Sequence, residues 1–298
     1  MPENRSSTKP ELLATDHRIM VGGTERTYSQ VTAAPSRGQG NPNDATEISA
    51  VLIFLHGSSQ TGQKVRAFSG NSLDELAESS RVAVVYPNGL KKLWNHTRSG
   101  GGAADDVAFM AALVDHFRRQ HRDIPVIVSG YSNGGQLVIR LIHEIPEKFD
   151  GAAIFSATLP RAGGLAFADK MLPLPVVMMH GTRDLVVPYR GDAGFLGLGF
   201  RNRGPSAPET AQYFAARNGI TAPPRESRLP HRAESGRTSV TLTSYEQAGR
   251  DPVKLYTVVG GGHVVPNRHK KPIFVLGRST QDISAIDALV EAFPALRG

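Results

Sequence analysis

The 298-residue sequence contains no cysteine. This absence excludes disulfide bonds, thiolate metal ligands and a cysteine nucleophile, and it suits a reducing compartment. The sequence also lacks an apolar run of the roughly 20 residues that a membrane-spanning helix needs. Its polar first residues lack the apolar core of a signal peptide. We therefore expect a cytoplasmic protein with no membrane partner, while secretion stays open.

Acidic residues are fewer than basic ones. The chain has 34 Lys and Arg against 27 Asp and Glu, which gives a formal net charge of +7. A positive excess of this kind can indicate a nucleic-acid partner when the basic residues cluster. Here they are spread along the chain, and no zinc-finger or RNA-binding signature accompanies them. We expect solvated surface charge, no nucleic-acid partner, no metal and no cofactor; the sequence leaves the oligomeric state unknown.

Short, wholly apolar segments alternate with segments of helical periodicity. The apolar segments are residues 51–55, 82–86, 126–129, 152–155, 176–179 and 255–259. Strands that are apolar on both sides lie in mostly parallel sheets with helices on both faces. Helical periodicity is found over residues 105–120, 208–217 and 282–293. The pattern predicts an α/β fold with a doubly wound sheet.

The sequence predicts one domain preceded by a short N-terminal segment. Residues 17–33 alternate polar and apolar side chains around Gly22-Gly23, which predicts a β-hairpin. We expect residues 1–16 to be a flexible segment and residues 17–298 to form a single catalytic domain, because no internal repeat or Ser/Gly linker divides them. Residues 157–174 leave little room for a large cap domain, so we predict an open cleft.

The pattern Gly130-x-Ser132-x-Gly134 follows the apolar segment 126–129 and precedes a helical stretch, residues 136–144. A strand, a tight turn flanked by small residues and a helix are what a nucleophile elbow needs, because the strained turn lifts the serine hydroxyl above the sheet. The alternative is a glycine-rich turn with a structural serine. We predict that Ser132 is a nucleophile.

A serine hydroxyl needs a histidine base and an acid that orients the histidine. Asp184 follows the apolar segment 176–179, and His263 follows segment 255–259 after three glycines. The order serine, acid, histidine is that of α/β-hydrolases. His56 and His180 also follow apolar segments, but each precedes a glycine, and we expect them to pack in turns.

Two backbone amides should bind the oxyanion that forms on the attacked carbonyl. We assign one to Asn133, the residue after the nucleophile, and the other to Ser58, with Ser59 as the alternative. Ser59, Trp94 and Tyr131 are predicted to contact substrate; for Trp94, the only tryptophan, packing over the core is equally compatible with the sequence.

Two neighbouring aspartates, Asp105 and Asp106, begin the predicted helix over residues 105–120. A pair of adjacent carboxylates can suggest acid–base chemistry. Aspartate is also a preferred residue at helix N-termini, where its side chain accepts hydrogen bonds from backbone amides. We interpret this pair as a helix cap.

Several stretches together resemble the polyhydroxybutyrate depolymerase-like esterases, a group that includes feruloyl and acetyl xylan esterases. The stretches are LHGSSQTG (55–62), DDVAFMAALVD (105–115), SGYSNGG (129–135), HGTRDLVVPY (180–189), ETAQYFAARNG (209–219) and GGGHVVPN (260–267). The resemblance implies an α/β-hydrolase fold, the same triad and a carboxylic ester substrate. The chain departs from that family in lacking cysteines, an additional substrate-binding domain and an aromatic residue soon after His263, which favours small soluble esters or short oligomers.

These observations predict a serine carboxylesterase that works through an acyl-enzyme. The expected substrates are short-chain acyl esters, hydroxyalkanoate oligomers, or feruloyl and acetyl esters. One alternative is a serine peptidase of the same fold, since amide and ester hydrolysis use the same groups. A second is a binding protein that keeps the fold without catalysis.

Overall fold

The computed structural model describes residues 10–34, 48–79, 81–97, 104–161, 168–191, 204–269 and 276–297. Within them ten strands form one sheet in the order β1-β2-β4-β3-β5-β6-β7-β10-β9-β8. The strands are β1 Leu12–Val21, β2 Thr24–Ala33, β3 Ala50–Leu55, β4 Val82–Pro87, β5 Val126–Tyr131, β6 Gly151–Phe155, β7 Val176–Gly181, β8 Arg225–Arg228, β9 Ser239–Tyr245 and β10 Val253–Val259.

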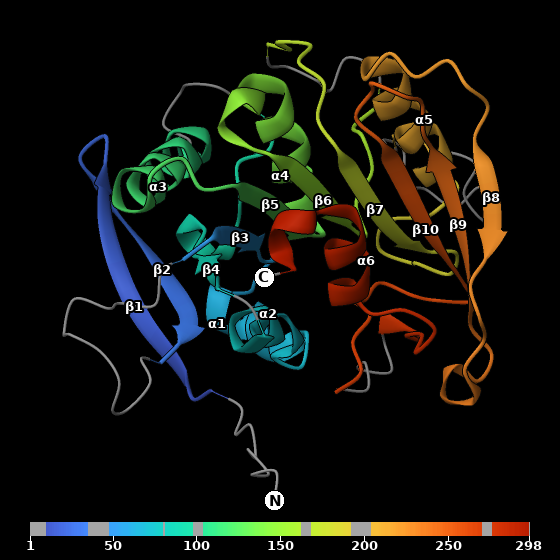
Figure 1. The fold of residues 1–298 in the computed structure, drawn as a ribbon, viewed down its shortest axis with the longest axis horizontal. Coiled ribbons are helices and arrows are strands. Elements are labelled where there is room, and N and C mark those ends of the chain that lie inside the picture. Colours follow the sequence, from blue (N-terminus) through green and yellow to red (C-terminus); the bar gives the residue numbers. More distant parts are fainter. Residues whose placement is uncertain are drawn as a thin grey trace, which may run out of the picture.

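The central six strands, from β4 to β10 in sheet order, are parallel. The β1–β2 hairpin extends the sheet antiparallel at one edge, and β9 and β8 extend it antiparallel at the other. Figure 1 shows this hairpin and β8 at opposite sides of the molecule. The predicted mostly parallel sheet is confirmed, and so is the hairpin that turns at Gly22-Gly23.

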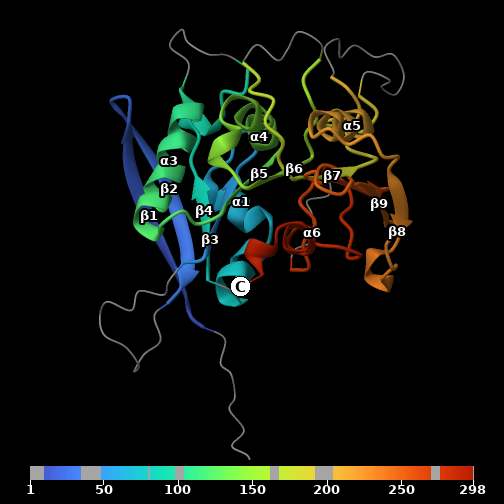
Figure 2. The ribbon, with the colours of Figure 1, turned by 45° about the horizontal axis from the view of Figure 1, so that its top comes forward.

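Helices cover both faces of the sheet. They are α1 Gly62–Phe68, α2 Glu75–Ser79, α3 Asp106–His121, α4 Asn133–Glu144, α5 Ala207–Arg217 and α6 Ala285–Ala292. Apolar residues of α3, α4 and α5 pack on one face, and those of α1, α2 and α6 pack on the other. Figure 2 shows α4 and α5 on the opposite side of the strands from α1 and α6. None of the helices in the described ranges is long and apolar enough to cross a bilayer.

Strand β3 illustrates why the central segments are wholly apolar. Val51, Ile53 and Leu55 belong to the core under α3, α4 and α5. The alternate residues, such as Leu52 and Phe54, belong to the core under α1, α2 and α6. Since successive side chains of a strand point to opposite faces, a strand between two helical layers has apolar residues at every position.

The predicted flexible segment, residues 1–16, needs correction at its end. Strand β1 begins at Leu12, and residues 12–16 pair in register with β2, from Leu12 opposite Ala33 to Asp16 opposite Ser29. The backbone hydrogen bonds of this pairing order the segment although three of its five side chains are exposed. Residues 1–9 lie outside the described part of the chain.

Strands β8 and β9 are absent from the sequence-based prediction. All four residues of β8 are exposed, and it pairs only along β9. The connection from β6 to β7 contains no cap domain among its described residues, 156–161 and 168–175.

The predicted helix cap is confirmed for Asp105, whose Oδ1 accepts a hydrogen bond from the Ala108 amide at 2.8 Å. Asp106 has a different role. Its side chain is fully buried, forms an ion pair with Arg26 of β2 at 2.5 Å and accepts a hydrogen bond from the Asn95 amide at 2.6 Å. The Arg26 guanidinium also lies 4.1 Å from the centre of the Phe109 ring. Asp106 therefore anchors the hairpin and the segment around Asn95 to α3.

Replacing Asp106 with alanine should lower the free energy of unfolding by about 3 kcal/mol, because a buried Arg26 charge would lose its partner. The matched control is Glu25→Ala, which removes an ion pair with Arg18 on the same hairpin between exposed side chains and should cost less than about 1 kcal/mol. Urea unfolding of both variants measures the difference. Equal losses would contradict an anchoring role for Asp106.

Candidate active site

Ser132 occupies the sharp turn between β5 and α4. Its backbone angles, φ 55° and ψ −118°, lie in a region that non-glycine residues rarely adopt and that costs on the order of 1–3 kcal/mol. The side chain is half-buried. Gly134 permits the turn, because a Cβ there would overlap the carbonyl oxygen of Leu55 at the end of β3. The local structure is the strained strand-to-helix elbow that the glycine pattern predicts.

Three side chains from three loops meet at the carboxyl ends of the strands. The Ser132 Oγ lies 2.9 Å from His263 Nε2, and His263 Nδ1 lies 2.6 Å from Asp184 Oδ2. Ser132 follows β5, Asp184 follows β7 and His263 follows β10. Both contacts are within hydrogen-bond distance, so the structure brings together the three residues that the sequence singled out.

Gly181 allows the loop that carries Asp184 to contact the loop that carries His263. A Cβ on Gly181, the last residue of β7, would overlap the carbonyl oxygens of Gly261 and Gly262. The His263 amide donates to the Leu276 carbonyl at 2.7 Å, and the Tyr131 hydroxyl donates to the His263 carbonyl at 2.8 Å. The backbone of His263 is thereby fixed from two directions.

The Asp184 carboxylate is buried but accepts hydrogen bonds from several neighbouring groups. Its Oδ1 accepts from the amides of Val186 and Val187, at 2.9 and 2.8 Å. Burial on its own raises the pKa of this group, whereas hydrogen bonds and charge interactions with His180 and His263 lower it; together they bring the pKa of Asp184 to about 2. Asp184 is therefore ionised at neutral pH and can stabilise a positive charge on His263.

The two backbone amides proposed for the oxyanion are both available. The Asn133 amide is at the first position of α4, where helix geometry supplies no acceptor. The Ser59 amide donates to the Lys92 carbonyl at 2.9 Å, and Ser59 has a left-handed φ of 61°. The Ser58 amide has no acceptor within the described part of the chain. The geometry favours Ser58 over Ser59 as the second donor.

Residues 107–194 match the family model for Phospholipase/Carboxylesterase. The chain is 27% identical over 293 residues to NocK from Nocardia uniformis subsp. tsuyamanensis, a protein assigned as an esterase, covering 93% of this chain and 81% of NocK. It is also 27% identical over 157 residues to the bifunctional acetylxylan esterase/xylanase XynS20E from Neocallimastix patriciarum, covering 52% of this chain and 22% of that one.

The fold is similar to that of the acetyl xylan esterase from Aspergillus awamori. The TM-score is 0.56 at 14% identity, and the match covers 94% of this chain and 99% of that one. The chain is a carboxylic ester hydrolase of the α/β-hydrolase fold. The predicted fold and enzyme class are thereby confirmed.

Trp94 of this esterase differs from its predicted role as a substrate contact. Its side chain is only 3% exposed, packs in the core and donates through Nε1 to the His56 carbonyl at 2.9 Å. The Asn133 side chain makes two hydrogen bonds with the Trp94 backbone. Its Oδ1 accepts from the Trp94 amide at 2.7 Å, and its Nδ2 donates to the Trp94 carbonyl at 3.2 Å. Trp94 thus supports the turn that contains Ser132.

Tyr131 also differs from its predicted role as a substrate contact. It is 4% exposed, and its ring packs between Phe68 and the imidazole of His263, with centroid distances of 5.1 and 4.9 Å. Its hydroxyl already donates a hydrogen bond to the His263 carbonyl. Of the predicted substrate contacts, only Ser59 is exposed.

His56 packs in a turn, as predicted. Its Nδ1 lies 2.7 Å from the Gly57 carbonyl, its Nε2 accepts from the Gly89 amide at 2.9 Å, and its ring packs on Trp94. Within the described ranges, no group of three His, Asp or Glu side chains is arranged to hold a metal ion.

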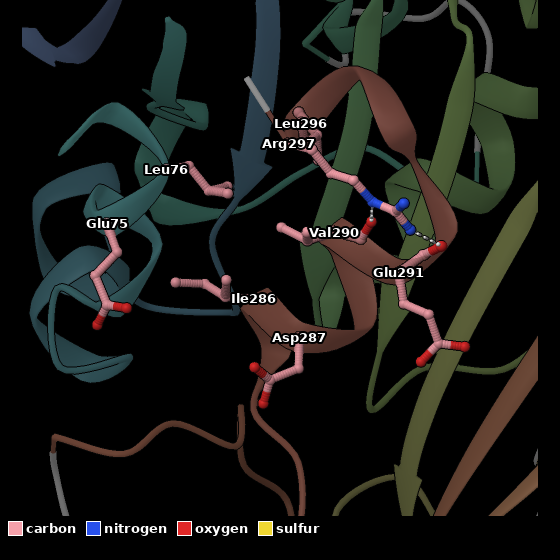
Figure 3. A pocket seen from close by; sticks show the side chains of 8 residues that line it. All are labelled: Glu75, Leu76, Ile286, Asp287, Val290, Glu291, Leu296 and Arg297. Carbon is pink, nitrogen blue, oxygen red and sulfur yellow. Dashed lines mark hydrogen bonds between the residues drawn. The ribbon is translucent and has the colours of Figure 1, made fainter. Parts of the chain in front are cut away.

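A separate hollow of about 490 Å³ lies between α2, α6 and the short helix Pro294–Leu296. Figure 3 shows Leu76, Ile286 and Val290 facing it. The carboxylates at its rim already have basic partners: Glu75 pairs with His269, Asp287 with Arg268, and Glu291 with Lys254. None of the three residues that meet at the elbow lines it, so this hollow is distinct from the active site of the esterase.

Acidification should destabilise this esterase partly through Asp184. The pKa of its carboxyl is about 2 in the folded state, against 3.8 for an aspartate of the unfolded chain, so the unfolded state binds more protons between these values. Its stabilising contribution is nearly complete at about pH 5 and is lost as the pH falls toward 2. The difference in unfolding free energy between wild type and Asp184→Asn should shrink from about pH 5 to about pH 3 in urea titrations. A constant difference would contradict the low pKa.

Proposed function

We propose that Ser132, His263 and Asp184 form a catalytic triad that hydrolyses carboxylic esters through an acyl-enzyme. His263 Nε2 removes the hydroxyl proton as the Ser132 Oγ attacks the carbonyl carbon. The amides of Asn133 and Ser58 stabilise the oxyanion. Protonated His263 then gives its proton to the departing alkoxide, and the alcohol leaves. Water attacks the acyl-enzyme in the same way and releases the acid.

The continuous line of hydrogen bonds from Ser132 through His263 to Asp184 carries this proposal. In that line the carboxylate, ionised at neutral pH, faces Nδ1. The imidazole consequently carries its hydrogen on Nδ1 and offers the lone pair of Nε2 to the hydroxyl. That is the tautomer a general base needs.

We propose esters of short acyl groups, acetyl above all, as substrates. The similarity to acetyl xylan esterases supports this choice. Ser58 and Ser59, in the loop assigned to the second oxyanion donor, are small and exposed, and Ser132 is partly exposed. Hydroxyalkanoate oligomers and feruloyl esters are the other substrates that the sequence resemblance implies. A peptidase function has less support, because the described chain contains neither a propeller nor a cap that would select peptides.

Replacing Ser132 with alanine should reduce kcat for p-nitrophenyl acetate by about 10⁴-fold or more, since the nucleophile is lost. Circular dichroism and the unfolding midpoint should show that the variant stays folded. Rates for acetate, butyrate, octanoate and ferulate esters on the wild-type enzyme test the acyl preference. Turnover by the alanine variant at the wild-type rate would refute the triad, whereas faster octanoate than acetate hydrolysis would refute only the preference.

The second oxyanion donor is a backbone amide, which makes a specific test possible. Ser58→Pro removes the N–H group and should lower kcat about 10²-fold, the usual effect of losing one oxyanion donor. Ser58→Ala keeps the amide and should change kcat less than about threefold. Ser59→Ala keeps the neighbouring amide that bonds to Lys92, and the unfolding midpoints of all three variants control for damage to the loop. If Ser58→Pro were as active as Ser58→Ala, Ser58 would not be the donor.

A further inference from the structure

A second histidine lies beside the Asp184 carboxylate. His180 is in β7, is 1% exposed, and places its Nε2 3.4 Å from Asp184 Oδ2. The same nitrogen lies 2.8 Å from the carbonyl oxygen of Val187. The triad mechanism uses His263 alone, so a buried histidine next to the acid needs a separate explanation.

The contacts of His180 define which of its nitrogens carries the hydrogen. A carbonyl oxygen can only accept, so Nε2 must donate to Val187. That hydrogen also faces Asp184 Oδ2. The distance of 3.4 Å between Nε2 and Oδ2 is long for a hydrogen bond but short enough for electrostatic attraction. Nδ1 is buried and has no hydrogen-bond partner among the described residues. The ring is therefore oriented by its Nε2 side alone.

Val187 connects His180 to the other oxygen of the carboxylate. Its amide donates to Asp184 Oδ1 at 2.8 Å, while its carbonyl accepts from His180. The carboxylate is consequently held through Oδ1 by the turn and approached at Oδ2 by both histidines. Rotation of the carboxylate would disturb all these contacts together.

We propose that His180 is a positioning residue, which fixes the Asp184 carboxylate and the turn through Val187 so that Oδ2 meets His263 Nδ1. The inference rests on the proposed triad. It extends that triad by a residue that touches neither Ser132 nor a substrate bound there. The contact of His180 with the carboxylate is also one of those that lower the pKa of Asp184.

Three substitutions separate positioning from simple packing. His180→Phe keeps a ring but removes the donor. His180→Gln places an amide nitrogen near the position of Nε2, and His180→Asn places it near the position of Nδ1, which has no partner among the described residues. Tyr189→Phe is the matched control, because the Tyr189 ring packs on His180 at 5.9 Å while its hydroxyl bonds to Thr257.

We expect His180→Phe and His180→Asn to lower kcat for p-nitrophenyl acetate by tenfold to about a hundredfold with KM little changed, as a small displacement of a catalytic group does. The acidic limb of the kcat/KM profile should move to lower pH, because a misplaced carboxylate stabilises protonated His263 less. His180→Gln should restore both quantities substantially, and Tyr189→Phe should resemble wild type.

A readout independent of activity is the far-downfield proton resonance of the hydrogen bond between His263 Nδ1 and Asp184. It should broaden or shift upfield in the Phe and Asn variants and return in the Gln variant. Unchanged kcat, pH profile and resonance in His180→Phe would overturn the inference, as would equal losses in all three His180 variants. A wild-type enzyme without esterase activity would instead refute the proposed function, and the resonance would still test His180.

Discussion

The hydrogen bond between Asp184 and His263 is the interaction on which the site depends. It joins the loop after β7 to the loop after β10, and these two strands are parallel neighbours in the sheet. Ser132 follows β5, which lies two strands from β7. Parallel strands end at the same edge, so their following loops share one surface. In the proposed mechanism, the Asp184 carboxylate, ionised at neutral pH, makes the His263 imidazole a stronger base, and this base activates the otherwise weakly nucleophilic Ser132 hydroxyl.

Much of the fold is visible in the sequence because burial on both faces leaves a simple pattern. The parallel strands appear as wholly apolar segments, and the residues that follow β5, β7 and β10 could be placed at one sheet edge from that pattern alone. Strand β8 has no such pattern, since its sequence Arg-Glu-Ser-Arg is exposed throughout. Its place is determined by pairing with β9, which is a property of the assembled sheet.

The errors within the site concern side chains whose surroundings come from distant loops. Trp94 is buried because His56 and Asn133, both remote in sequence, close around it. Tyr131 is directed inward by a bond to the backbone of His263. The preference for Ser58 over Ser59, which the sequence analysis already made, is supported by a contact that the sequence does not reveal, between the Ser59 amide and the Lys92 carbonyl. Composition and spacing contain none of this information.

The residues that position the site form a chain of contacts reaching the edge of the sheet. Asn133 holds Trp94, the next residue Asn95 donates its amide to Asp106, and Asp106 pairs with Arg26 in β2. Arg140 of α4 also donates to the Asn95 carbonyl at 2.9 Å. The segment that contacts Asn133, the proposed oxyanion donor, is thus tied to α3, α4 and the N-terminal hairpin. Because buried polar groups are costly to leave without partners, this network restricts where the elbow can lie.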